Sequence, residues 1–236
     1  MGEVRWISRR SIKVLAAVAV MLGAYLLLVR PWFLRWGASD AEIHQTMPGD
    51  ELSKAPAYVA TRSITIKAPA ELVWRWVVQV GQDRAGFYSY TWLENLFRAD
   101  MHNANRTVDD WQMRNVGDTV WLARSDRYQG MARQTVALVT PNRALVLVSP
   151  SDYERISAGG RAQGSWAFIL ERVDPQTTRL ILRSLSGPSG SVWQKGFSYL
   201  LFDPAHFIME RKMMLGIKKR AEACMWWFNV CGCPGP

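Results

Sequence analysis

The order of the predicted elements indicates an α+β protein, in which a curved antiparallel sheet wraps around a long C-terminal helix behind one N-terminal transmembrane helix. Three observations predict this arrangement. An uncharged apolar run occupies residues 14–29, a strand with two helices is followed by paired strands, and a helical segment fills residues 203–223. That last helix must bury an apolar stripe, and the concave face of the sheet offers the surface for it.

The first predicted element is a membrane anchor within residues 1–36. Its sixteen uncharged residues, 14–29, give about 24 Å of helix, and flanking apolar residues extend the span to residues 12–34. Four Lys or Arg residues precede residues 14–29 and two follow them, which places the N-terminus in the cytoplasm and the domain outside. A cleaved signal peptide is the alternative, although bulky residues follow the segment where a small-x-small site is needed.

The formal net charge of +9 lies largely in the anchor, because residues 1–36 hold six basic side chains and one acidic one. The remaining chain has no dense basic stripe with interleaved aromatic residues, so we expect no nucleic-acid partner. The three cysteines fall in a tail, residues 224–236. They are too few for a disulfide framework or a closed zinc site, and we predict no metal or cofactor.

The globular domain is expected at residues 58–223, after a polar linker of little regular structure at residues 37–57. It opens with a strand at residues 58–67, whose alternating apolar and polar residues predict burial on one face only. Pro69 then stands in the first turn of a helix that has an apolar stripe.

A second helix is expected at residues 89–98, and irregular chain at 99–116 leads to a strand at 119–123. The following part reads as strands and turns alone, with hairpin strands at 132–140, 144–149, 165–172 and 179–184. In the last helix, Asp203 is expected as the N-cap and Pro204 as the first helical residue.

The sequence RSITIKAPAELVWRWVVQVGQ, residues 62–82, resembles the SRPBCC superfamily, the START/Bet v 1-like helix-grip fold. The stretches GFYSYTWLEN at 86–95 and DPAHFIMERK at 203–212 are similar to a bacterial membrane-anchored subgroup. The resemblance covers about residues 36–223. It implies a hydrophobic cavity between the sheet and the long helix, and it implies no single chemistry.

Two polar residues of the last helix, His206 and Glu210, fall in the middle of its apolar arc near Met213. Burial of polar groups without partners costs about 1–3 kcal/mol, so the pair needs a reason. It either anchors a ligand head group, acts as a catalytic acid/base pair, or forms a buried pair satisfied by itself or by Arg and backbone groups.

A second cluster combines aromatic side chains with polar tips and is predicted to line the cavity, the alternative being plain packing of the second helix: Phe87, Tyr88, Tyr90, Trp92, Glu94 and Asn95. His102 lies in a polar stretch, where a solvated surface position is expected. A metal site that joins it to Glu94, His206 and Glu210 is conceivable, but no spacing demands one.

The leading hypothesis is a membrane-anchored helix-grip protein that binds a hydrophobic or amphipathic small molecule, such as a lipid. The alternatives are an enzyme of the polyketide cyclase or dehydratase type, with His206 or Glu210 as base, and a cell-envelope interaction module without a ligand. The sequence lacks the Gly-x-Ser-x-Gly, P-loop, His-Glu-x-x-His and Gly-x-Gly-x-x-Gly motifs. Whether a reaction is catalysed stays open.

Overall fold

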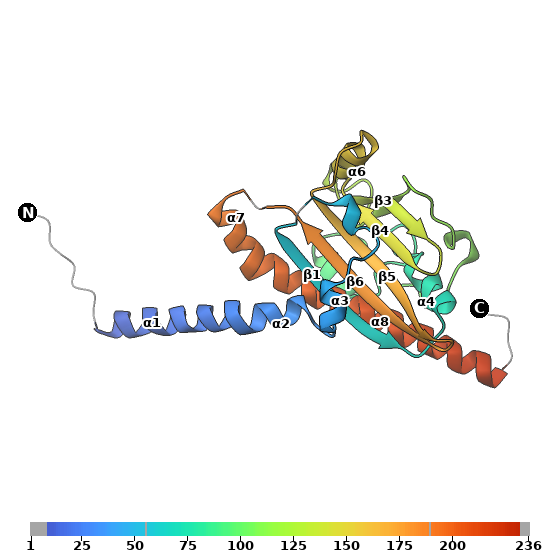
Figure 1. Ribbon diagram of the computed structural model, residues 1–236, viewed down its shortest axis with the longest axis horizontal. Coiled ribbons are helices and arrows are strands. Elements are labelled where there is room, and N and C mark those ends of the chain that lie inside the picture. Colours follow the sequence, from blue (N-terminus) through green and yellow to red (C-terminus); the bar gives the residue numbers. More distant parts are fainter. Residues whose placement is uncertain (1–8, 55, 189, 232–236) are drawn as a thin grey trace, which may run out of the picture.

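The computed structural model describes residues 9–54, 56–188 and 190–231. Six antiparallel strands form one curved sheet in the order β1-β6-β5-β4-β3-β2, and the long helix α8 (Asp203–Cys231) lies along one face, the inner face (Figure 1). The predicted α+β arrangement is therefore confirmed. The strands are β1 (Tyr58–Ile66), β2 (Thr119–Trp121), β3 (Arg133–Thr140), β4 (Ala144–Val148), β5 (Gly164–Asp174) and β6 (Thr177–Ser186).

The core lies between the inner face and two helices, α8 and α4 (Ala70–Val77). The apolar side of α8 buries Met214, Ile217 and Ala221 completely. Gly216 lets the loop that contains Tyr88 approach α8, because a Cβ atom at Gly216 would collide with the carbonyl oxygen of Tyr88. The loop is thereby held against α8.

Helix α8 does not begin where the sequence predicts. Helical backbone starts with α7 (Val192–Phe197), which Ser191 caps, and continues through a π-helical turn at Ser198–Phe202 into α8. Asp203 therefore lies inside a helix, with φ −59° and ψ −45°, and is not an N-cap. Pro204 lacks an N–H and crowds the preceding turn, which the wider π turn accommodates.

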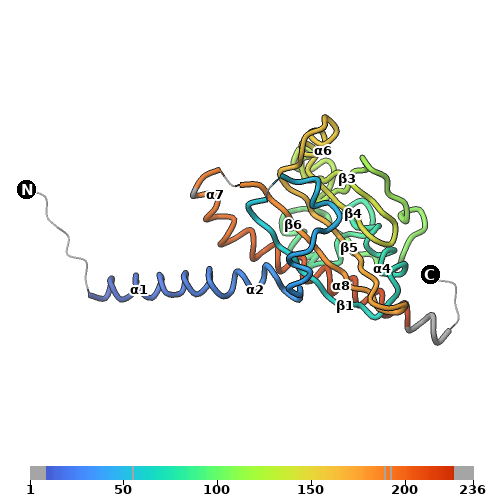
Figure 2. The backbone as a smooth tube through the Cα atoms, viewed as in Figure 1, coloured from blue at the N-terminus to red at the C-terminus, as the bar shows by residue number. Residues whose placement is uncertain are grey.

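The apolar N-terminal segment is one continuous helix, made of α1 (Arg9–Ala24), a π-helical turn at Tyr25–Val29 and α2 (Arg30–Leu34). Its 26 residues give about 39 Å of helix, enough to cross a membrane by length and composition. A signal sequence meets the same criteria. None of the residues of α1 is buried, and the helix projects from the domain (Figure 2).

The end of this N-terminal helix belongs to the domain core. Phe33 is only 2% exposed and stacks on Phe207 of α8, with ring centroids 5.4 Å apart. Arg30 forms an ion pair with Asp203 at 2.9 Å. The expected boundary at residue 36 thus falls within a packed part of the structure.

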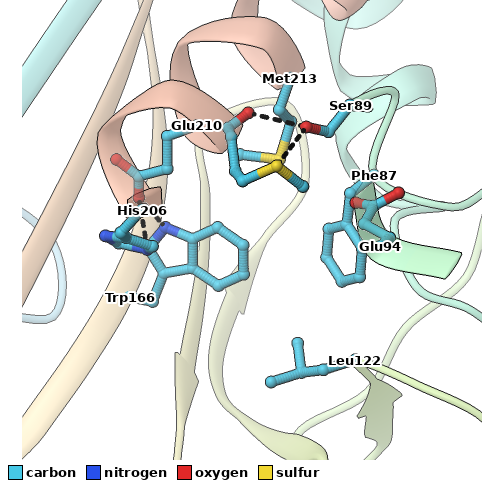
Figure 3. Close-up of a pocket in the computed structure, with 9 residues that line it drawn as sticks. Phe87, Ser89, Glu94, Leu122, Trp166, His206, Glu210 and Met213 are labelled. Carbon is cyan, nitrogen blue, oxygen red and sulfur yellow. Dashed lines mark hydrogen bonds and ion pairs between the residues drawn. The ribbon is translucent and has the colours of Figure 1, made fainter. Parts of the chain in front are cut away.

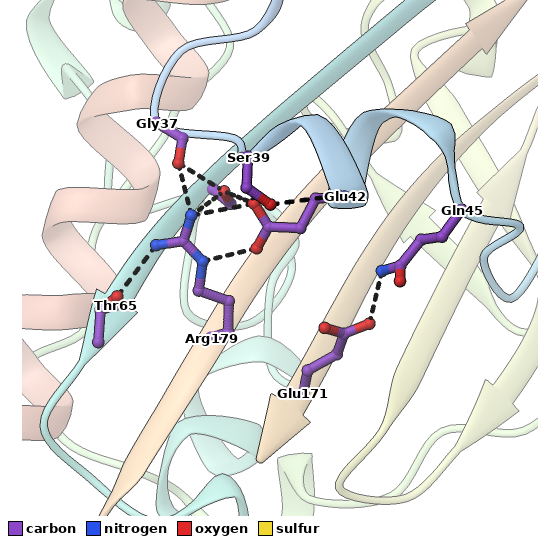
Figure 4. A network of polar contacts seen from close by, with 8 residues as sticks. Gly37, Ser39, Glu42, Gln45, Thr65, Glu171 and Arg179 are labelled. Atoms are coloured by element: carbon purple, nitrogen blue, oxygen red, sulfur yellow. Dashed lines mark hydrogen bonds and ion pairs between the residues drawn. The ribbon is translucent and has the colours of Figure 1, made fainter. Parts of the chain in front are cut away.

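Within residues 37–57, expected to be an irregular linker, residues 37–54 form a strap over the outer face of the sheet. The strap contains α3 (Asp40–His44), with a capping box between Ser39 and Glu42, and a short turn of 3-10 helix at Asp50–Leu52. Glu42 pairs with Arg179 of β6 at 2.6 Å and accepts a hydrogen bond from Ser63 of β1. Contacts of the strap with the sheet, including Gln45 on Glu171, are drawn in Figure 4.

The strap changes the burial of β1 and the acidity of Glu42. Residues 60–63 of β1 are all buried, so the strand is covered on both faces and not half-buried as its alternation predicted. Burial alone would raise the pKa of Glu42. The hydrogen bonds from Arg179, the Ser39 backbone and Ser63 outweigh burial and lower that pKa to about 2.

The hairpins β3–β4 and β5–β6 confirm the predicted strand pairs. Helix α5 (Thr91–Leu96) is shorter than expected, and α6 (Pro150–Ser157) interrupts a stretch predicted to contain only strands and turns. Ser149 caps α6 through the Asp152 N–H, with Pro150 in the first turn, a start signal that the sequence reading missed. Two further 3-10 turns lie at Asp109–Trp111 and Tyr128–Gly130.

We predict that Phe33→Ala lowers the free energy of unfolding by about 3–5 kcal/mol, because it removes a buried ring from the contact between α2 and α8. Chemical denaturation of the full chain in detergent, followed by tryptophan fluorescence, measures this loss. Leu27→Ala, on the same helix but 76% exposed, is the control and should have no such effect. Equal stability of both variants would contradict the packing role of Phe33.

Candidate functional site

A cavity of about 150 Å³ lies between the sheet and α8. Trp166 comes from β5, Leu122 follows β2, and the loop before α5 together with α5 provides the opposite wall (Figure 3). The walls are mostly apolar, with polar groups from both sides. The lining residues are Phe87, Ser89, Glu94, Leu122, Trp166, His206, Met209, Glu210 and Met213.

A second and larger hollow of about 460 Å³ adjoins this cavity. The two share Leu122, Trp166 and His206, so these side chains stand at the boundary between them. The larger hollow also reaches Tyr58 on β1 and Phe202 in the turn before α8. The site therefore consists of the smaller space, the inner cavity, and the larger one, the outer hollow.

Glu210 is fixed by partners from the sheet. It is 2% exposed, forms an ion pair with the fully buried Arg62 of β1, and accepts a hydrogen bond from Trp166 Nε1 at 2.6 Å. Ser184 of β6 donates a further bond at 3.3 Å. These donors satisfy the carboxylate, as a buried charge requires.

The same neighbours keep Glu210 ionised. Complete burial by itself raises the pKa of this carboxyl group. His206 and Arg62, with the hydrogen bonds from Arg62 and Trp166, outweigh burial and hold the pKa below its ordinary value. His206 Nε2 lies 3.3 Å from Glu210 Oε1, and its ring stacks on Phe202 at 5.5 Å. Glu210 thus orients an imidazole that stands between the two spaces.

Glu94 of α5 differs from Glu210 in its hydrogen bonding and in the direction of its pKa shift. Its Oε2 atom is buried and has no hydrogen-bond partner among the residues that the structure describes. Burial raises the pKa of Glu94 to about 7. The group faces the inner cavity from the wall opposite Glu210 (Figure 3), and it can accept or release a proton near neutral pH.

Five of the nine predicted ligand-binding residues line the inner cavity: Phe87, Glu94, His206, Glu210 and Met213. Tyr88 lies in the core instead. Its hydroxyl donates to the Trp76 carbonyl at 3.0 Å and accepts from Gln79 at 2.9 Å, so the phenol already has its partners. Phe87 lines the cavity, whereas Tyr88, with a left-handed backbone (φ 56°), turns its ring into the core.

The other three predicted residues also lie outside both spaces. Trp92 is 68% exposed on the outer side of α5, and Tyr90 packs edge-on against it. The Asn95 side chain bonds the backbone N–H and carbonyl of Met101, which holds the chain after α5. Helix α5 has only six residues, and Glu94 is the one that lines the cavity. Trp92 and Asn95 lie on other faces of this short helix.

The sequence reading missed four residues of the inner cavity, and Trp166 is the most important of these. The alternation of β5 already placed Trp166, Phe168 and Leu170 on one face, and that face proved to be the inner one. The signal was therefore present in the strand pattern. The four missed residues are Ser89, Leu122, Trp166 and Met209.

The described residues contain no group of three or more His, Cys, Asp or Glu side chains placed to hold a metal ion. His102 is exposed, and its Nδ1 contacts the Asp100 carbonyl at 3.0 Å, away from the cavity-lining residues. The conceivable site joining His102 to Glu94, His206 and Glu210 is therefore not formed.

The strand order and α8 give this chain the helix-grip arrangement that its sequence resemblance implied. No protein-family model matches the sequence, and no curated protein matches it. The membrane-anchored bacterial subgroup stays a prediction.

Solved structures with a similar backbone arrangement include CalC, a self-sacrificing resistance protein from Micromonospora echinospora (TM-score 0.41, 11% identity, covering 70% of this chain and 94% of that one). The Zhui aromatase/cyclase from Streptomyces sp. R1128 has a TM-score of 0.38 at 12% identity, covering 74% and 97%. The Aha1 dimer from Colwellia psychrerythraea has 0.35 at 15%, covering 69% and 98%. These likenesses concern the backbone alone.

We predict that Arg62→Met and Glu210→Met each lower the free energy of unfolding by about 3–5 kcal/mol, because each leaves an unpaired buried charge. The double variant should lose less unfolding free energy than the sum of the losses in the two single variants. Chemical denaturation of the full chain measures all three. Glu71→Gln, which breaks an exposed ion pair with Arg172, should cost less than about 1 kcal/mol, and strict additivity at Arg62 and Glu210 would refute the coupling.

We predict that Glu94→Gln stabilises the chain increasingly as the pH rises from 5 to 8. The raised folded-state pKa means that the wild type loses stability as the pH climbs from about 4.5 to about 7, where the unfolded chain is already ionised. A difference of about 1–2 kcal/mol is expected at pH 8, below the full shift because solvent reaches part of the group. Unfolding at both pH values measures it, and a pH-independent difference would argue against a perturbed Glu94.

Proposed function

We propose that this chain is a membrane-anchored protein that binds a small amphipathic molecule in the space between the sheet and α8. The observation that carries the proposal is the inner cavity itself. Its walls are mostly apolar, while a carboxyl oxygen without a hydrogen-bond partner among the described residues, Glu94 Oε2, faces it. Few placed polar groups within apolar walls are typical of ligand sites.

The polar groups favour a ligand head that donates hydrogen bonds. Glu210 is already satisfied by Arg62 and Trp166, so it contributes structure and charge more than free bonding capacity. Glu94 Oε2 still needs a donor, and burial without one costs free energy. A hydroxyl or amine group of a ligand meets this need, and His206 stands at the other side of the same space.

The dimensions favour a ligand that extends beyond the inner cavity. About 150 Å³ is small for an organic ligand, because typical sites measure about 300–1,000 Å³. The outer hollow of about 460 Å³ begins at the same Trp166 and His206 side chains. The head would occupy the inner cavity, and an apolar tail would occupy the outer hollow.

The membrane anchor is supported by length, composition and packing. The helix at Arg9–Leu34 is long and apolar enough to span a bilayer. Cleavage behind it would remove Phe33 and Arg30 from their contacts with Phe207 and Asp203, which favours a retained anchor over a cleaved signal peptide. The distribution of Lys and Arg favours a domain outside the cytoplasm, and proximity to the bilayer makes a lipid the first candidate ligand.

We expect native mass spectrometry of the full chain, released from detergent, to detect a bound small molecule. Leu122→Trp adds bulk at the boundary of the inner cavity and the outer hollow, so it should remove most of this adduct. Met131→Trp, at a position 71% exposed and lining neither space, is the matched control and should retain it. Equal adducts in the wild type and both folded variants would count against binding in this space.

A further inference from the structure

The helical segment that precedes α8 presents large apolar side chains to the outside. Along α7 and the π turn, residues 192–202, five of them are exposed by about half or more. Trp193 is 89% exposed, the highest value among the large apolar residues that the structure describes. The five are Trp193, Phe197, Leu200, Leu201 and Phe202. A concentration of this kind in one short segment marks a contact surface.

Three contacts fix this segment beside the N-terminal helix. The Tyr25 hydroxyl donates to the carbonyl of Tyr199, and Arg30 pairs with Asp203 while its guanidinium lies 3.8 Å from the Tyr199 ring centroid. Both α1 and α7 project from the same end of the domain (Figure 2). The apolar segment therefore lies at the same end of the domain as the proposed anchor and is joined to it at Tyr25 and Arg30.

The depth of these contacts follows from helix geometry. Tyr25 precedes Trp32, an aromatic residue suited to the membrane boundary, by seven residues, or about 10 Å along a helix. Tyr199 is held near this level by its contact with Tyr25. Figure 1 shows α7 at the level of the N-terminal helix along that helix's own direction, so a bilayer that encloses Tyr25 also meets α7.

The composition of the segment fits a lipid surface. Residues 184–202 contain no acidic side chain and a single basic one, Lys195. A lysine can extend to the head groups while its neighbours enter the apolar region. Its helical backbone also satisfies most of its own polar groups, as insertion requires.

We propose that residues 192–202 form a second membrane contact, which inserts its apolar side chains below the head groups into the acyl-chain region of the bilayer beside the N-terminal helix. This inference rests on the proposed anchor. It has a consequence for the site, because Phe202 both belongs to the segment and lines the outer hollow against His206. The outer hollow would then open at the lipid surface, where an amphipathic ligand can enter without crossing water.

The test uses the full chain in vesicles of phosphatidylcholine and phosphatidylglycerol, with its three cysteines replaced by alanine and one new cysteine carrying an environment-sensitive fluorophore. The labelled variants are Trp193→Cys, Leu201→Cys, Leu27→Cys on the anchor and Met131→Cys as the exposed control. Lipids with a quencher on the acyl chain near the head group report the contact.

We expect the labels at residues 193 and 201 to shift to the blue and to lose fluorescence, as the label at 27 does, while the label at 131 stays unchanged. Quenching at 27 alone, with 193 and 201 resembling 131, would overturn the second contact and leave the anchor intact. If 27 is also unquenched, the anchor fails and this inference fails with it. The two failures therefore give different patterns.

Discussion

The buried ion pair between Arg62 and Glu210 is the contact on which the arrangement of this protein depends. Arg62 lies in the middle of β1, donates from Nε to the carbonyl of Phe33 at 2.8 Å, and lies 5.4 Å from the ring of Phe207. One guanidinium thus joins the N-terminal helix, the sheet and α8. Two charges without solvent are costly unless both are well paired, and this requirement fixes the register of the three elements.

The same pair determines which groups of the site remain available. Because Arg62 and Trp166 occupy Glu210, that carboxylate is a fixed negative charge that orients His206, and a role as free base is disfavoured. Glu94 has no such partner within the described part of the chain, so its pKa is about 7 and its Oε2 atom lacks a hydrogen bond there. Two carboxyl groups on opposite walls therefore have different properties, set by their surroundings.

Periodicity in the sequence predicted the sheet, the long helix and the inward position of His206 and Glu210, because residues on one face recur at fixed spacing. It did not predict that Glu42 would bring the strap onto Ser63 and Arg179, since that contact joins residues far apart in the chain. The same limit hid Arg62 as the partner of Glu210. Phe87 and Tyr88 are neighbours in one motif, and the sequence pattern does not distinguish them. Only the folded loop shows that Tyr88 packs in the core and Phe87 lines the cavity.

The contacts that attach the N-terminal helix to the domain would fix the orientation of the domain relative to a bilayer. A flexible linker would let the domain turn freely above a bilayer, whereas Phe33 and Arg30 fix the helix to α8 and its π turn. Both π turns precede a proline, Pro31 or Pro204, so the two helices widen where they meet through Tyr25 and Tyr199. Under the proposed anchoring, this junction sets how the outer hollow is oriented relative to the bilayer. The route by which a ligand enters then depends on the angle at which the two helices are joined.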